Sequence, residues 1–189
     1  MLKELARIDR ELLIFLNSLH NPALDTVMQL FSERWFWLPM YVVLVGWLIW
    51  YFRRKAYLLL PLLGLAVFLA DRISSGFFKP YFARLRPCHD PDLQGLIQFI
   101  DGCGGQFGFV SSHAANTFVL ASLLHFILRP GHAGLRWFFW VWAAVVSYRR
   151  VYLGVHYPSD ISLGALLGIL IGWLIAKVYR YFERRYFTP

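Results

Sequence analysis

Two histidines lie next to residues that could make them chemically reactive. His156 is followed one helical turn later by Asp160, and His113 comes directly after two serines. A carboxylate can accept a hydrogen bond from an imidazole ring and hold the tautomer whose other nitrogen is free to attack. A second, protonated histidine can give its proton to a leaving oxygen. The pattern therefore predicts a nucleophile, His156, oriented by Asp160, and a general acid, His113.

Basic side chains and a predicted helix start accompany these histidines. Lys79, Arg86 and Arg150 provide one ammonium and two guanidinium groups, which can neutralise a phosphate, and arginine adds bidentate geometry. Ser111 and Ser112 lie where a helix should begin, so backbone N–H groups and the positive end of the helix point toward a bound anion. Histidines combined with an anion site of this kind predict phosphoryl transfer.

The composition indicates where such a site would lie. Of the 189 residues, 58% are hydrophobic and only 16% are charged, whereas a soluble domain carries about 25% charged residues. Membrane residence is therefore the expected class. The net charge of +8 suits anionic lipids or phosphates. No nucleic-acid motif is present, so we expect membrane lipids and a lipid phosphate or diphosphate as partners, and no nucleic acid.

Five apolar segments have the length of a bilayer crossing or come close to the roughly 20 helical residues it requires. They are Trp35–Phe52, Ala56–Phe78, Ser112–Leu128, Leu135–Arg149 and Pro158–Tyr181. The expected fold class is all-α, a polytopic membrane helix bundle with five to six transmembrane helices. The whole chain, residues 1–189, is expected to be one domain.

The first 34 residues have a different pattern. Apolar residues recur at helical spacing but are interrupted by polar residues and by Pro22. This pattern predicts an amphipathic segment, residues 1–34, lying in the membrane interface. A sixth crossing in this segment is the alternative.

The charges predict an orientation. Five crossings would put the Arg53–Lys55 loop, the loop at residues 129–136 and the basic C-terminus on one side, which the positive-inside rule makes cytoplasmic. The loop at residues 79–111 and the turn at residues 150–157 then share the outer face and carry the candidate site. We therefore expect a bacterial inner-membrane protein whose active site faces the periplasm or the cell exterior.

Three motifs follow one another in order: Lys-x6-Arg-Pro from Lys79, Ser-x-His from Ser111, and Arg-x5-His-x3-Asp from Arg150. This order and spacing resembles the type 2 phosphatidic acid phosphatase superfamily, which includes bacterial membrane lipid phosphatases and vanadium haloperoxidases. The resemblance covers Lys79 to Asp160, and the flanking apolar segments fit the membrane branch.

The resemblance implies a role for each motif residue. The phosphate would be bound by Lys79, Arg86, Ser111, Ser112 and Arg150. His156 would form a phosphohistidine, Asp160 would orient it, and His113 would be the general acid. The family needs neither metal nor cofactor, and no metal-ligand spacing is present here. Three positions depart from the family pattern. Val110 replaces a proline and Arg149 replaces a serine. Ser112 replaces a glycine, which raises a question about the local backbone angle.

Several residues outside the motifs carry separate expectations. Cys88 and Cys103, the only cysteines, lie in the outer loop, and we expect a disulfide worth about 3 kcal/mol in the chain-entropy model, with two free thiols as the alternative. Arg84 is expected to face solvent or lipid headgroups. For Asp71 and Arg72 a structural pair or snorkelling is favoured, and support of the site is the alternative. Gly164, Gly168 and Gly172 predict close helix packing.

Together these observations predict a metal-independent lipid phosphatase. The small size and outward site resemble bacterial undecaprenyl-diphosphate phosphatases, so undecaprenyl diphosphate is the expected substrate. Phosphatidylglycerophosphate, phosphatidate and lipid A 1-phosphate are the alternatives. A non-catalytic protein that binds or translocates phospholipids, and a haloperoxidase, are the rival classes. The oligomeric state is left open.

Overall fold

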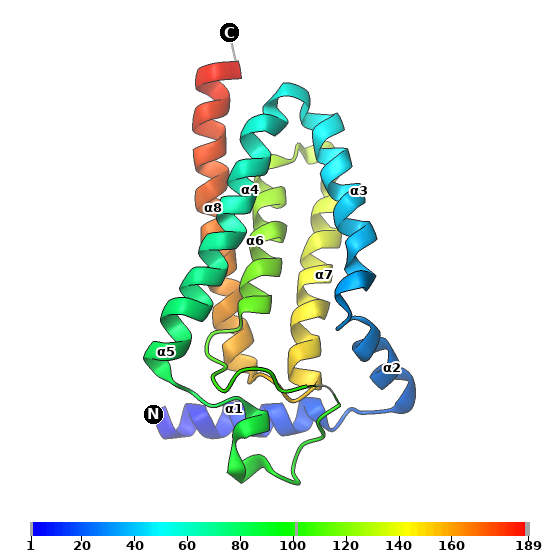
Figure 1. The fold of residues 1–189 in the computed structure, drawn as a ribbon, viewed down its shortest axis with the longest axis vertical. Coiled ribbons are helices and arrows are strands. Elements are labelled where there is room, and N and C mark those ends of the chain that lie inside the picture. The colour runs from blue at the N-terminus through cyan, green and yellow to red at the C-terminus, as the bar shows by residue number, and fades with distance from the viewer. Residues whose placement is uncertain (1, 101, 188–189) are drawn as a thin grey trace.

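The computed structural model describes residues 2–100 and 102–187; Met1, Asp101, Thr188 and Pro189, which the predicted domain includes, lie outside the described residues. The bundle consists of α3 (Arg34–Phe52), α4 (Ala56–Asp71), α6 (Ser112–Ile127), α7 (Ala133–Tyr152) and α8 (Pro158–Phe187), as Figure 1 shows. Two N-terminal helices, α1 (Leu2–Asn17) and α2 (Pro22–Leu30), lie at one end of it. Apart from one isolated bridge between Leu85 and Phe107, the described residues contain no β-structure, so the all-α prediction is confirmed.

The predicted apolar segments correspond closely to these helices, with three differences. The fifth segment continues to Phe187 rather than ending at Tyr181. The second segment continues beyond Phe78, because α4 passes through a π-helical stretch, Arg72–Phe78, into α5 (Lys79–Phe82). The fourth ends at Tyr152 rather than Arg149. Two stretches of the described chain, Trp35–Phe82 and Pro158–Phe187, are long and apolar enough to cross a membrane. The chain reverses within the first of these, at the Arg53–Lys55 turn (Figure 1). The number of transmembrane helices stays a prediction.

The closest helix packing joins α6 to α8. A Cβ atom added at Gly164, Gly168 or Gly172 would lie closer than 3.0 Å to backbone atoms of Ser111 or of α6. Small residues at this spacing let two helix backbones approach each other, as the sequence predicted. The contact holds the start of α6 against the start of α8, and both ends carry candidate site residues.

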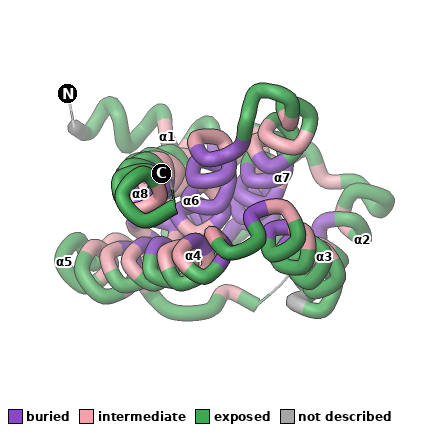
Figure 2. Tube along the Cα trace, turned by 90° about the horizontal axis from the view of Figure 1, so that it is seen from above, coloured by how far each residue is buried: buried purple, intermediate pink, exposed green. Residues whose placement is uncertain are grey.

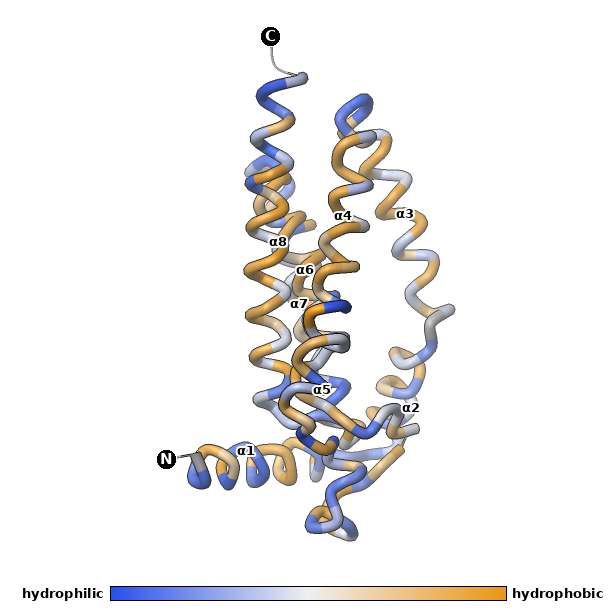
Figure 3. Tube along the Cα trace, turned by 60° about the vertical axis from the view of Figure 1, so that its left-hand side comes forward, coloured by the Kyte–Doolittle hydropathy of each residue, from blue (hydrophilic) through white to orange (hydrophobic). Residues whose placement is uncertain are grey.

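The outer helices expose apolar side chains. In Figure 2, α6 and the inner face of α7 are buried, while α3, α4 and α8 turn exposed faces outward. Large apolar residues on those faces include Val43, Phe68 and Leu170, which are 70%, 54% and 53% exposed. Figure 3 shows hydrophobic residues along the length of these helices and hydrophilic residues concentrated at the two ends. This distribution suits a bundle surrounded by lipid.

Helix α1 lies across one end of the bundle (Figures 1 and 3). It buries Leu13 completely and leaves Leu5 and Phe15 more than half exposed. Asn17 at its end donates to the carbonyls of Gln98 and Tyr152 and accepts from the N–H of Gln98. The helix does not run alongside the bundle helices, and its amphipathic, interfacial character stays a prediction. The hydrogen bonds of Asn17 hold the helix instead against the two loops that carry candidate site residues.

Candidate active site

His156 and Asp160 form a buried pair where the chain passes from α7 into α8. His156 is 1% exposed and Asp160 is fully buried, and Nδ1 of His156 lies 3.2 Å from Oδ2 of Asp160. The same carboxylate oxygen accepts a hydrogen bond from the N–H of Tyr157 at 3.1 Å. The tight turn before His156 uses Gly154 at φ +70°, a conformation that glycine adopts at little cost. With Nδ1–H donating to Asp160, Nε2 is the nitrogen left able to attack.

The other oxygen of Asp160 is bound by Arg84, a residue for which the sequence predicted a solvent- or headgroup-facing charge. That prediction is wrong. Arg84 Nη1 donates to Asp160 Oδ1 at 3.0 Å, and Nη2 donates to Asp9 of α1 at 2.7 Å. Asp9 also accepts hydrogen bonds from the N–H and hydroxyl of Ser159. The N-terminal helix thus reaches the reactive pair through one guanidinium group.

Only part of this hydrogen-bond network could be predicted from the sequence. Arg84 lies inside the Lys79–Arg86 segment and is one of the outer-face charges that break the positive-inside rule. Asp9, 75 residues away, carries no motif. Only the position of α1 across the end of the bundle brings its carboxylate to Arg84 (Figure 1).

The predicted serines lie where α6 begins. Ser111 is the N-cap, and its hydroxyl accepts a hydrogen bond from the N–H of Ala114 at 3.4 Å. Its own N–H donates to the carbonyl of Asp160 at 3.0 Å, which ties the second motif to the third. Lys79 Nζ donates to the hydroxyl of Ser112 at 3.2 Å. Ser112 is helical and has a negative φ, so the replacement of the family's glycine does not strain the backbone.

Arg86 is held by the loop that crosses the site. Its Nη1 donates to the carbonyl of Cys103 at 2.9 Å, and its Nε donates to the carbonyl of Phe107 at 3.3 Å. Cys103 is joined to Cys88 by a disulfide, with 6.0 Å between the Cα atoms. The disulfide therefore fixes the carbonyl that orients one of the predicted phosphate-binding groups.

Gly108 is a site residue that the sequence reasoning missed. A Cβ atom at this position would lie 2.9 Å from Asp160 Oδ2 and 3.2 Å from Cγ of Arg86. The backbone of Gly108 therefore packs directly against the reactive pair. A glycine three residues before the Ser-x-His motif was the available signal.

The cations lie close enough to affect the reactivity of His156. Burial is the main cause that lowers the pKa of His156 well below its usual value, and the positive charges of Arg150, Arg86, Lys79 and Arg84 lower it further, in that order. Cations of the first and third motifs therefore lie around one imidazole ring, which is kept in the neutral form that a nucleophile requires.

His113 lies in a different environment. It is exposed, in the first turn of α6, and lines a cavity of about 330 Å³ between α3, α6 and α7. Asp71, at the end of α4, lines the same cavity, and its charge acts on Lys79. Arg72 instead stacks on the Phe68 ring at 5.3 Å. The structure thus records no ion pair between Asp71 and Arg72, and it places Asp71 beside the site.

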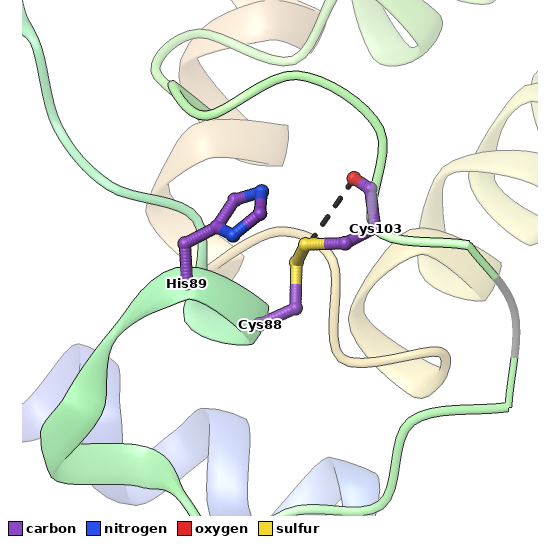
Figure 4. A group of neighbouring side chains, drawn as sticks. All are labelled: Cys88, His89 and Cys103. Atoms are coloured by element: carbon purple, nitrogen blue, oxygen red, sulfur yellow. Dashed lines mark hydrogen bonds between the residues drawn. A yellow bond between two sulfur atoms is a disulfide. The ribbon is translucent and has the colours of Figure 1, made fainter.

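One group of ligand-type side chains in the described residues is compact enough to hold a metal ion: Cys88, His89 and Cys103 (Figure 4). Both sulfur atoms belong to the disulfide, so neither is a thiolate able to bind a metal. The group does not involve His113, His156 or Asp160. Metal independence stays a prediction.

Comparison with known proteins finds similarity over most of the chain. A family model described as the PAP2 superfamily matches residues 59–184. The chain is 35% identical over 183 residues to a lipid A 4'-phosphatase of Porphyromonas gingivalis, covering 95% of this chain and 76% of the relative. It is 38% identical over 180 residues to a lipid A 4'-phosphatase of Bacteroides thetaiotaomicron, covering 92% and 78%.

A solved structure shares the fold. The transmembrane PAP2-type phosphatidylglycerolphosphate phosphatase of Bacillus subtilis superposes with a TM-score of 0.67 at 21% identity, covering 97% of this chain and 89% of that one. The matched family and the two relatives favour a phosphatase over a haloperoxidase or a non-catalytic lipid-binding protein. The chain belongs to the PAP2 superfamily, as its three motifs predicted, and is a phosphoric monoester hydrolase.

Proposed function

We propose that the chain removes a phosphate from a lipid A-type glycolipid, through a phosphohistidine on His156. The observation that carries the chemistry is the buried His156–Asp160 pair, with a nitrogen–oxygen distance of 3.2 Å, among cations of the first and third motifs. The observation that supports the substrate is the similarity to two lipid A 4'-phosphatases over more than nine-tenths of the chain.

In the first step, Nε2 of His156 attacks phosphorus while Nδ1–H donates to Asp160. Lys79, Arg86 and Arg150 neutralise the charge on the phosphate oxygens. The bond between phosphorus and the alcohol oxygen breaks, and that oxygen takes a proton from His113. The products are the free alcohol and a phosphohistidine.

In the second step, water attacks the phosphohistidine. Neutral His113 now takes a proton from this water, so the same group acts as acid and then as base. The bond between nitrogen and phosphorus breaks, and inorganic phosphate leaves. His156 and His113 return to their starting protonation states, so the cycle balances without a metal or cofactor.

This proposal replaces undecaprenyl diphosphate as the preferred substrate. Undecaprenyl diphosphate was chosen on small size and an outward site, which are properties of the wider family. The similarity to the lipid A 4'-phosphatases extends instead over 95% and 92% of the chain. We therefore place the target phosphate at the 4' position, rather than the 1-phosphate of the earlier alternative.

We also propose that the site faces the outside of a bacterial inner membrane, with the C-terminus in the cytoplasm. The Cys88–Cys103 disulfide at the site end of the molecule supports this, since disulfides persist in oxidising compartments. Basic residues gather at the opposite end, in the Arg53–Lys55 turn and at the end of α8, as the positive-inside rule requires. Reporter fusions at the C-terminus test the orientation.

The test of the substrate uses purified protein in detergent with a chelator present. Lipid A carrying both phosphates is supplied, and mass spectrometry of the product identifies which phosphate is lost. We expect release of the 4'-phosphate without added metal. Release from undecaprenyl diphosphate but not from lipid A would overturn the substrate assignment and leave the phosphohistidine chemistry intact.

A further inference from the structure

The cavity beside His113 is built differently from the phosphate site. It measures about 330 Å³, near the lower end of the range of about 300–1,000 Å³ for small-molecule sites. Its wall combines aromatic and polar side chains from four helices and from the turn before α3. The wall includes Glu33, Trp37, Tyr41, Asp71, Asn116 and Trp142.

The reaction geometry determines what enters this cavity. In phosphoryl transfer the attacking and leaving atoms lie roughly in line on opposite sides of phosphorus. His156 is the buried nucleophile, and His113 serves the leaving oxygen. The cavity that His113 lines is therefore on the leaving side, and it receives the part of the alcohol that carries the oxygen.

Charge separates the two sides of the site. The cations Lys79, Arg86 and Arg150 act on His156, whereas the cavity wall contains two exposed carboxylates, Glu33 and Asp71. Arg149 also lines the cavity and donates to the carbonyl of Phe31. Protonated His113 is the other cationic group of the lining. A second phosphate on the leaving group would therefore lie beside two carboxylates, which disfavour it.

The same wall suits a ring that carries hydroxyl or amino groups. Trp37 and Trp142 meet edge to face with 5.8 Å between ring centroids, and Tyr41 lies 6.0 Å from Trp142. These rings offer apolar surface to the C–H face of a sugar. Carboxylates accept hydrogen bonds from hydroxyl and ammonium groups. The amide oxygen of Asn116 has no hydrogen-bond partner among the described residues. The amide group can therefore rotate toward a ligand without breaking a hydrogen bond of its oxygen.

We propose that this cavity is the leaving-group subsite, that it binds the sugar ring bearing the target phosphate, and that it selects against diphosphates. The inference rests on the proposed function and deepens it, because it explains which alcohol the enzyme accepts. Glycerol phosphates lack the ring that the aromatic wall would contact, and lipid diphosphates place a second phosphate where the carboxylates lie.

The test compares kcat/KM for lipid A and for undecaprenyl diphosphate in wild-type protein and in two variants. Asp71→Asn keeps the shape of the side chain and removes its charge. We expect the ratio of lipid A to diphosphate activity to fall by about tenfold, the usual effect of losing one hydrogen bond to a charged group. Trp37→Leu removes the aromatic surface and should lower the same ratio by decreasing the lipid A activity.

Trp35→Leu is the matched control, because Trp35 is on the same helix, is 77% exposed and does not line the cavity. Its ratio should equal that of the wild type. An unchanged ratio in Asp71→Asn, in a protein that hydrolyses lipid A, would overturn the subsite and leave the proposed function standing. If wild-type protein does not hydrolyse lipid A, the proposed function fails, and the subsite fails with it.

Discussion

The two histidines of the site differ in how firmly the protein holds them. His156 is 1% exposed, its Nδ1 lies 3.2 Å from Asp160, and Asp160 is bound in turn by Arg84 and by the N–H of Tyr157. His113 is exposed and lines a cavity. Within the described part of the chain, its ring makes no hydrogen bond to another residue.

This difference follows from their proposed tasks. A nucleophile gains from being fixed and desolvated, because its geometry and tautomer are then set before substrate arrives. A general acid must follow the leaving oxygen of a bulky alcohol, so it needs space on its other side. The fold therefore surrounds one histidine with hydrogen bonds and leaves the other at the edge of a cavity. The predictions below test this contrast.

The largest effect is expected for His156→Ala. Without the nucleophile no phosphohistidine can form, and kcat should fall by about 10⁴-fold or more. Phosphate release from lipid A measures the loss, and thermal unfolding compared with wild type checks that the protein is folded. A folded variant with wild-type turnover would contradict the mechanism.

His113→Ala should lower kcat for lipid A by about 10²–10⁴-fold. The loss should be much smaller for p-nitrophenyl phosphate, whose leaving group departs without a proton. This dependence on the leaving group separates the two histidines, since His156→Ala should be equally damaging with both substrates. If His113→Ala lowered kcat equally for the two substrates, His113 would not be the general acid.

Arg84→Gln should lower kcat/KM by about 10- to 100-fold, because hydrogen bonds to charged groups contribute about 1.5–3 kcal/mol and each 1.4 kcal/mol is tenfold. Asp9→Asn should have a smaller effect, and in the double variant the two effects should not add, because both residues act on Asp160. Arg84→Lys should restore activity only in part, since an ammonium lacks the guanidinium fork.

Arg10→Gln is a matched control for this prediction. Arg10 is on the same helix as Asp9, but it contacts the exposed Asp92 and not Arg84. Replacing Arg10 should therefore leave kcat/KM at the wild-type value. Additive losses for Asp9→Asn and Arg84→Gln would mean that α1 does not act through the His156–Asp160 pair.

Reduction of the Cys88–Cys103 disulfide should destabilise the protein by about 3 kcal/mol, the value for a 15-residue loop. It should also raise KM several-fold, because the carbonyl of Cys103 orients Arg86. Thermal unfolding and kinetics with and without a reductant measure both effects. A variant with both cysteines replaced by serine should not respond to the reductant. Equal thiol labelling before and after reduction would show that no disulfide is present.

The smallest effect concerns pH. His156 must be neutral to attack, and its lowered pKa means that protonation inactivates it only below the usual value of 6.5. The acid limb of the kcat/KM profile should therefore lie below pH 6.5. The charged groups that act on the ring are its partner Asp160 and the cations Arg150, Arg86, Lys79 and Arg84. Arg84→Gln removes one cation, so its acid limb should move to higher pH; a limb that stays in place would argue against the network.

Much of the architecture could be predicted from local pattern. Apolar segments located each bundle helix, with the largest differences at the ends of α4 and α8, because hydropathy and length are properties of continuous stretches. The glycines at positions 164, 168 and 172 predicted close packing, because their spacing puts them on one face of a helix. Arg84 was misjudged because its partners, Asp9 and Asp160, lie 75 and 76 residues away in the chain.

The sequence by itself determined the family and the candidate chemistry: three motifs in order predict the histidines, the cations and the helix start proposed to bind an anion, since each is a short local pattern. The tertiary structure decided how that chemistry is supported and directed. It brought α1 against Arg84, placed Gly108 against the reactive pair and opened a cavity of about 330 Å³ beside His113. Such contacts join residues distant in the chain, and their geometry depends on how whole helices pack, which no local pattern encodes.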